Sequence, residues 1–161
     1  MLRLSKLTDY AVVVLLRLSE RARATEGVQT SPGLAAATGV PEPTVAKVLK
    51  ALAAGGLVVS QRGARGGYRL LRPVDTITVA DVITAIDGPI ALTACVDGGS
   101  TCDVQSVCAV KGRWDIVNNA IHIALSSITL AEMAQAELPQ ALRIPHAAHP
   151  ADPPLHQPAA E

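Results

Sequence analysis

Residues 31–71 carry the pattern that most restricts the fold: two short helices around a glycine turn, followed by a tight β-hairpin. Ser31-Pro32 predicts a helix start, with serine as the N-cap and proline at the first helical position, and Gly39 predicts its left-handed end. Another helix is expected over 42–54, ended by Gly55-Gly56. Its apolar residues recur at helical spacing and should be buried, namely Val45, Val48, Leu49 and Leu52. Two helices joined in this way are typical of a helix-turn-helix.

The residues after this helix pair predict the wing of a winged helix. Two β-prone runs, 57–60 and 68–71, flank the basic glycine-rich turn RGARGG at 62–67. Glycines let such a tip approach DNA closely, and arginine suits a narrow, electronegative minor groove. We therefore expect Arg62 to enter a groove and Arg65 to contact phosphate.

The outward side of helix 42–54 carries the expected DNA-reading residues. Thr44 and Lys47 are near its N-terminal end, where base edges are read in this docking mode, and Lys50 is an expected phosphate contact. The charge distribution agrees, although the net charge is zero. Residues 1–72 hold eleven basic and four acidic residues (+7), whereas residues 73–161 hold three basic and ten acidic residues (−7). A basic half is the electrostatic footprint of a phosphate-backbone partner.

Two further amphipathic helices are expected around this motif. One covers 5–23, where Ser5 can cap a face made of Leu7, Tyr10, Ala11, Val14, Leu15 and Leu18. The other covers 76–87, is capped near Thr78, and turns Val79, Val82, Ile83 and Ile86 inward. Aromatic residues make up only 2% of the chain, so aliphatic residues must form the core, which favours helices. The expected fold is mainly α, a winged helix-turn-helix with a small β-hairpin wing.

The C-terminal third predicts one long helix and then a tail. The helix is expected from Trp114 to about Glu137, with an apolar stripe suited to dimerisation or, alternatively, to an intramolecular core. The stripe consists of Trp114, Val117, Ile121, Ala124, Leu125, Ile128 and Ala131. Beyond it lie six of the eleven prolines and three of the four histidines, His146, His149 and His156, which reads as a disordered tail with solvated histidines. The expected domains are therefore 1–75 for DNA binding, 76–137 for the cysteine loop and dimerisation, and 138–161 for the tail.

All three cysteines, Cys95, Cys102 and Cys108, fall within fourteen residues at a C-x6-C-x5-C spacing. Zinc knuckles usually pair C-x2-C units, thioredoxin-like redox sites need C-x-x-C, and an odd count argues against a disulfide framework. Three thiolates on a short loop suit an iron–sulfur cluster whose last ligand comes from elsewhere. Three idle, buried thiols are the alternative. No apolar run reaches the roughly 18 residues of a membrane span, and the polar N-terminus is unlike a signal peptide, so we expect a cytoplasmic protein with reduced thiols.

Together these features resemble the family of bacterial winged-helix regulators that includes IscR, NsrR and RirA. The resemblance rests on RLSKLTDYAVVVLLRL at 3–18, RGARGGYRLLRP at 62–73, TVADVITAIDG at 78–88 and the cysteine triplet, and it covers roughly residues 1–135. It implies a homodimer that binds an operator and holds a 2Fe–2S or 4Fe–4S cluster through the three cysteines. The implied function is a repressor of iron–sulfur cluster assembly or iron homeostasis genes, in which cluster occupancy sets DNA affinity.

Two departures from the IscR-like pattern concern the cluster ligands. The first cysteine interval is six residues instead of five, and Lys111 stands where that branch has a histidine. A protonated lysine is not an iron ligand, so the fourth ligand must lie elsewhere. Resemblance to NsrR-like members implies Asp9 of the partner subunit. Its alternative role is a favourable charge near a helix start, and Asp97, Asp103 or a small exogenous ligand are the other candidates.

Two other functions fit the same residues. One is a thiol-only redox or nitric-oxide-responsive regulator that forms sulfenic acid or a disulfide. The other is a zinc-stabilised interaction module whose basic half binds an acidic protein. We expect neither an enzyme nor a small-molecule substrate, because the sequence shows no Ser/His/Asp set, phosphate loop or metal-hydrolase motif, and His122 is the only histidine outside the tail.

Overall fold

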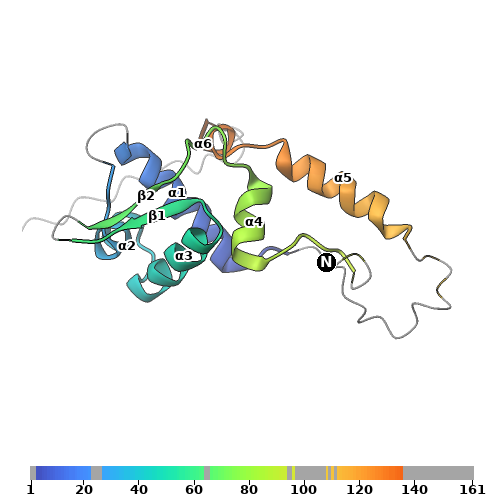
Figure 1. The fold of residues 1–161 in the computed structure, drawn as a ribbon, viewed down its shortest axis with the longest axis horizontal. Helices are drawn as coiled ribbons and strands as arrows, with labels where there is room; N and C mark the ends of the chain where they lie inside the picture. The colour runs from blue at the N-terminus through green and yellow to red at the C-terminus, as the bar shows by residue number, and fades with distance from the viewer. Residues whose placement is uncertain are drawn as a thin grey trace, which may run out of the picture.

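The computed structural model describes residues 3–22, 27–63, 66–93, 96, 108, 110 and 112–135. Several residues singled out above lie outside this part of the chain, namely Arg65, Cys95, Asp97, Cys102, Asp103, Lys111 and the segment 136–161. The elements are α1 (Lys6–Ala22), α2 (Ser31–Thr38), α3 (Glu42–Ala54), β1 (Val58–Gln61), β2 (Gly67–Leu70), α4 (Val79–Asp87), α5 (Trp114–Ser126) and α6 (Leu130–Gln135). The first three helices and the hairpin form one body, from which α5 projects (Figure 1). None of the described helices is long and apolar enough to cross a membrane.

The helix pair α2–α3 forms as expected except at the start of α2. The N-cap is Thr30 and not Ser31: the Thr30 hydroxyl accepts a hydrogen bond from the Gly33 N–H at 3.2 Å. Thr30 has the extended backbone that an N-cap requires (φ −80°, ψ 155°), whereas Ser31 is already helical. Gly39 ends α2 with φ 72°, and its N–H donates to the Ala35 carbonyl at 2.9 Å. The predicted left-handed end is therefore confirmed.

Helix α3 has the predicted bounds and the predicted buried face. Val45, Val48, Leu49 and Leu52 are fully buried, and they pack against Ala11, Val14, Leu15 and Leu18 of α1 in a single core cluster. The same cluster contains Val74, Ile77, Val82 and Leu130. Residues on both sides of the expected domain boundary at 75 thus contribute to one core.

The β-hairpin has antiparallel register, with Val58 opposite Leu70 and Gln61 opposite Gly67. A further antiparallel bridge joins Tyr68 of β2 to Gln29. The Tyr68 N–H donates to the Gln29 carbonyl at 2.8 Å, and the Gln29 N–H donates to the Tyr68 carbonyl at 2.9 Å. This contact requires glycine at position 67, because a Cβ there would lie 2.5 Å from the Gln29 carbonyl oxygen. The hairpin is therefore tied to the segment that leads into α2, which fixes the wing relative to the helix pair.

Helix α4 begins with the capping predicted near Thr78. The Thr78 hydroxyl accepts from the Asp81 N–H at 3.1 Å, and the Asp81 carboxylate accepts from the Thr78 N–H at 2.9 Å. Val82 and Ile83 are buried as expected, while Val79 and Ile86 are only partly buried. The helix packs on α1 and α3 and ends near the start of α1.

The single long helix expected over 114–137 is wrong. The chain forms α5, which ends at Ser126 with Ser127 as its C-cap, and starts again as α6 at Leu130. Thr129 and Glu132 make a capping box: the Glu132 carboxylate accepts from the Thr129 N–H at 2.7 Å, and the Thr129 hydroxyl accepts from the Glu132 N–H at 3.2 Å. The break also lets the Val79 N–H donate to the Ile128 carbonyl and the Leu130 N–H donate to the Ile77 carbonyl, both at 2.9 Å. Leu130 then enters the core, fully buried.

Candidate functional site

The exposed side of α3 presents two lysines without charge partners. Lys47 and Lys50 are exposed and Thr44 is partly buried, on the side opposite the core-facing stripe. Within the described residues, neither lysine takes part in a hydrogen bond or an ion pair. Their ammonium groups are therefore available to an external anion, as a phosphate or a base edge would require.

The hairpin adds exposed arginines beside α3. Arg62 follows directly after β1 and is exposed, whereas Arg65 lies outside the described residues. The sequence prediction missed Arg69, which is exposed on β2 between Tyr68 and Leu70, two residues packed against the core. The period-2 alternation of a strand would have identified it. Arg72, by contrast, is occupied by an ion pair with Asp81 at 3.1 Å and a hydrogen bond to the Thr76 carbonyl at 3.2 Å.

The start of α1 is held to the end of α4 next to Asp9. Thr8 is only 2% exposed, and its hydroxyl donates a 2.6 Å hydrogen bond to the Asp87 carboxylate. Partial burial by itself would raise the pKa of Asp87, but hydrogen bonds from Thr8 and Ser5 outweigh it and lower the pKa below the ordinary value. The neighbouring Asp9 is exposed, and within the described residues its carboxylate has no hydrogen-bond or ion-pair partner. Asp9 thus stands on a fixed helix start with a free carboxylate.

We expect Thr8→Val to reduce the free energy of unfolding at neutral pH by about 1 kcal/mol, because valine fills the same space but cannot donate to Asp87. The loss is modest because the Asp87 carboxylate is mostly exposed. The folded state lowers this pKa, so the contribution is present above the ordinary value of 3.8 and disappears as the pH falls through the lowered pKa. Urea unfolding between pH 7 and pH 3 measures the difference. In an Asp87→Asn background the substitution should cost less and lose its pH dependence; an equal cost in both backgrounds would contradict the pairing.

Of the predicted cluster ligands, the structure describes Cys108 and Asp9. Cys108 is partly buried and is not in a disulfide, whereas Cys95 and Cys102 lie outside the described residues. Among the described residues no group of three His, Cys, Asp or Glu side chains is gathered as a metal site. A free thiol and an unpaired, exposed carboxylate are donor types that bind iron, so these two residues fit such a cluster by their chemistry.

Helix α5 exposes an unusual amount of apolar side chain. Ile116 is 75% exposed and Ile123 is 68% exposed, and the other large exposed residues on or next to this helix are Val110, Trp114, Val117 and Ile128. Within the described part of the chain, α5 contacts the rest of the molecule mainly through α4 and the segment 90–92. A helix with such a surface is typical of an element that packs against another chain.

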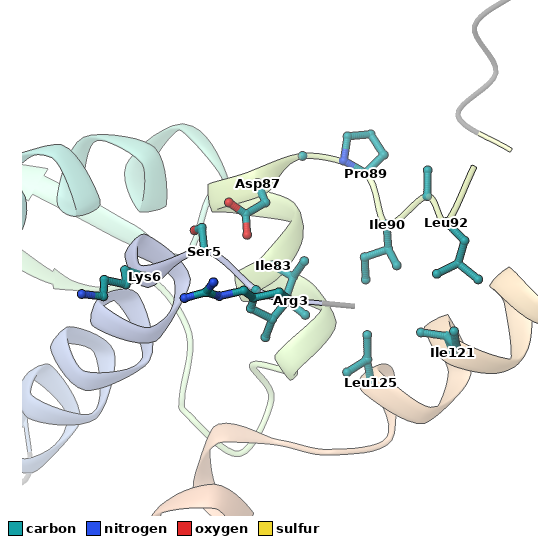
Figure 2. Close-up of a pocket in the computed structure, with 13 residues that line it drawn as sticks. Arg3, Ser5, Lys6, Ile83, Asp87, Pro89, Ile90, Leu92, Ile121 and Leu125 are labelled. Atoms are coloured by element: carbon teal, nitrogen blue, oxygen red, sulfur yellow. The ribbon is translucent and has the colours of Figure 1, made fainter. Parts of the chain in front are cut away.

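An open groove of about 770 Å³ separates the inner side of α5 from α1 and α4. Figure 2 shows Ile90 and Leu92 facing Ile121 and Leu125 of α5 across it. Its other end is lined by Arg3, Ser5 and Lys6 from the start of the chain and by Asp87 of α4, with Ser5 next to Asp87 (Figure 2). The groove therefore joins the start of α1 to the segment that leads into the cysteine loop.

A helix-turn-helix with a basic reading helix and a β-hairpin wing defines a winged-helix transcriptional regulator. Residues 4–136 match the family described as Rrf2, iron-dependent transcriptional regulator, and the chain belongs to that family. It is 34% identical over 139 residues to Rv1287 of Mycobacterium tuberculosis, named as an HTH-type transcriptional regulator, covering 86% of this chain and 85% of that one.

Solved structures agree with this assignment. CymR of B. subtilis, titled the global cysteine regulator, is similar with a TM-score of 0.62 and 27% identity, covering 84% of this chain and 98% of that one. IscR of T. potens is similar with a TM-score of 0.59 and 30% identity, covering 83% and 87%. The winged-helix fold and the DNA-binding, transcription-regulating class expected from the sequence are confirmed, whereas the single long C-terminal helix is not.

Proposed function

We propose that this regulator is an iron–sulfur-dependent repressor that binds its operator as a homodimer. The observation that carries the proposal is the pair of lysines on α3 that have no partner among the described residues, next to a basic wing, in a chain that also bears three clustered cysteines. In this assignment residues 1–75 read DNA, residues 76–137 supply the ligand loop and the dimer contact, and 138–161 form the tail. The proposed targets are genes of iron–sulfur cluster assembly or iron homeostasis.

The exposed apolar surface of α5 supports the proposed homodimer. Ile116 and Ile123 lie seven residues apart, two helical turns, and so share one side of the helix. Packing this side against the same side of a second copy would remove both residues from water in a symmetric contact. Two copies of α3 would then address two major-groove segments about one helical turn apart, or a multiple of that distance.

The proposed cluster ligands are Cys95, Cys102 and Cys108, with Asp9 of the partner subunit as the fourth. Once bound, the cluster would make the loop sensitive to oxidants, nitric oxide and iron supply. Asp9 suits the last position because its carboxylate is exposed, and no described residue pairs with it, on a helix start that Thr8 holds in place. A carboxylate is a weaker iron ligand than a thiolate, which suits a labile site. Ligation from both subunits would fix the dimer geometry and with it the separation of the two reading helices.

The DNA contacts should separate into two kinds. Lys47→Ala should weaken binding to the cognate operator by roughly 1–3 kcal/mol and affect random DNA much less, because a base contact is specific. Lys50→Ala should weaken all sequences alike and flatten the salt dependence, as expected of a phosphate contact. Arg62→Ala should cost most where the contacted minor groove is narrow and A·T-rich. Competition assays on cognate and scrambled duplexes at two salt concentrations measure all three.

Arg113→Ala is a matched control for these variants, because it removes an exposed positive charge at the start of α5, away from α3. It should bind the operator like the wild type. Wild-type binding by both Lys47→Ala and Arg62→Ala would refute the assignment of the reading helix and the wing.

A thiol-only regulator is the second candidate, because the chain is also similar to CymR, a global cysteine regulator. Colour and metal content distinguish the possibilities. Protein purified anaerobically should be brown or red with iron and sulfide if it holds a cluster, and its Mössbauer spectrum should identify the cluster type. A colourless protein without metal would favour the thiol switch, and stoichiometric zinc would favour the interaction module. Operator binding of the same sample before and after cluster removal then tests whether occupancy controls affinity.

A further inference from the structure

Asn118 is the one buried residue of α5. It is 8% exposed, whereas its neighbours Val117 and Asn119 are exposed. Burying a carboxamide is unfavourable unless its polar atoms are hydrogen-bonded. A buried asparagine on a helix whose other residues are exposed or only partly buried therefore needs hydrogen-bond partners.

The Asn118 carboxamide binds the backbone of the segment that follows α4. Its Nδ2 donates to the Ile90 carbonyl at 3.0 Å, and its Oδ1 accepts from the Leu92 N–H at 3.1 Å. The carboxamide thus uses its donor and its acceptor on two backbone groups that are two residues apart in the chain. A neighbouring β-strand would bind the backbone of this segment in the same pattern. The side chains of Ile90 and Leu92 face α5 as well (Figure 2). The two hydrogen bonds therefore hold this segment to α5, while its apolar side chains lie across the groove from Ile121 and Leu125.

This contact lies at the base of the cysteine loop. Leu92 precedes Cys95 by three residues, and Cys108 precedes the start of α5 at Trp114 by six. Asn118 is one helical turn beyond Trp114. Asn118 therefore links the segment before the cysteine loop to the helix that follows the loop. Fixing both ends of a loop reduces the conformations open to it, and so lowers the entropic cost of bringing its ligands together.

We propose that Asn118 is a positioning residue for the cysteine loop: by holding Ile90 and Leu92 to α5, it sets the span across which the three cysteines bind the cluster. This rests on the proposed iron–sulfur function. Asn118 does not touch the cluster itself and acts through the backbone that leads into Cys95. The comparable role in other metal proteins belongs to the hydrogen-bond partners that orient the ligands.

The test compares Asn118→Leu with Asn119→Leu. Leucine is close to asparagine in size and removes both hydrogen bonds at 118, whereas the exposed Asn119 makes no hydrogen bond to the loop base among the described residues. In the full-length dimer under anaerobic conditions, Asn118→Leu should lose its cluster absorption roughly 10-fold faster on exposure to air. Asn119→Leu should match the wild type. Asn118→Gln, which keeps a carboxamide, should recover a longer lifetime than Asn118→Leu.

Hydrogen exchange of the Leu92 amide in the cluster-free protein gives an independent readout. The amide should be protected in the wild type and in Asn119→Leu, and should exchange faster in Asn118→Leu. The positioning role would be overturned if Asn118→Leu lost protection of the Leu92 amide but kept the wild-type cluster lifetime. It would also be overturned if the Leu92 amide were unprotected in the wild type, or if Asn118→Leu and Asn118→Gln had equal cluster lifetimes. A wild-type protein without a cluster would contradict the proposed iron–sulfur function itself. That result would be seen before any variant is compared.

Discussion

Replacing Leu130 with alanine should lower the free energy of unfolding by about 2–5 kcal/mol. Leu130 is fully buried, although it lies far along the chain from the helices it packs against, and alanine would leave a cavity in the shared core. The large effect depends on the break that separates α6 from α5, because one continuous helix would not place Leu130 there. Urea denaturation measures the change.

Met133→Ala is the matched control for Leu130→Ala. Met133 lies in the same short helix but is 41% exposed, so its loss should cost well under half as much. Equal, small effects for the two variants would mean that α6 is not docked in solution.

The second large effect is expected at the cysteines. Each of Cys95→Ala, Cys102→Ala and Cys108→Ala should give a colourless protein, or one with greatly reduced iron, because a four-ligand site rarely survives the loss of a thiolate. The proteins should remain folded, since Cys108 is only partly buried and is absent from the core cluster. Iron and sulfide analysis with circular dichroism checks both statements. A variant that keeps full iron and sulfide would exclude its cysteine as a ligand.

Asp9→Ala is a milder version of this experiment. It should leave the dimer intact and the three thiolates in place, but shorten the lifetime of the cluster. An unchanged spectrum and lifetime would return Asp9 to the role of a surface charge near a helix start.

The parts of the fold that the sequence predicted correctly have local causes. Helix α3 has the predicted bounds because a regular apolar stripe ends at two glycines. Helix α4 begins at Val79 because its N-cap, Thr78, opens a capping box that spans only four residues. The N-cap of α2 was misplaced by one residue, since Thr30 and Ser31 both carry a suitable hydroxyl and backbone conformation decides between them.

The C-terminal helix was mispredicted because its apolar spacing continues through the break. Leu125, Ile128 and Ala131 recur at helical spacing. The backbone of Ile128 and Leu130, however, is hydrogen-bonded to that of Val79 and Ile77. That pairing is non-local, and periodicity carries no information about it. The capping box of Thr129 and Glu132 was the local signal that marked the new start.

In the candidate site, too, features with local causes could be predicted from the sequence, and features that depend on distant contacts could not. The outward position of Lys47 and Lys50 follows directly from the buried stripe of α3, so the sequence sufficed. Asn118 could not have been identified, because its partners are the backbone of Ile90 and Leu92, and an asparagine on a helix is usually solvated. A ligand donated across subunits, as proposed for Asp9, also depends on an assembly that a single chain does not encode in its spacing.

Helix α5 is hydrogen-bonded to the rest of the molecule near both of its ends, so that a displacement at one end would tilt the whole helix. Just beyond the C-terminal end of α5, Ile128 and Leu130 are hydrogen-bonded to Val79 and Ile77 at the start of α4. Asn118, in the first half of α5, is hydrogen-bonded to the segment after α4. Thirteen residues of helix span about 20 Å, so a tilt of about 5° about the Ile128 end would displace the far end by roughly 2 Å. A small change where the cysteine loop meets α5 would therefore move Ile116, which lies near that end, more than Ile123, which lies closer to Ile128, so the exposed apolar surface would tilt instead of shifting as a whole.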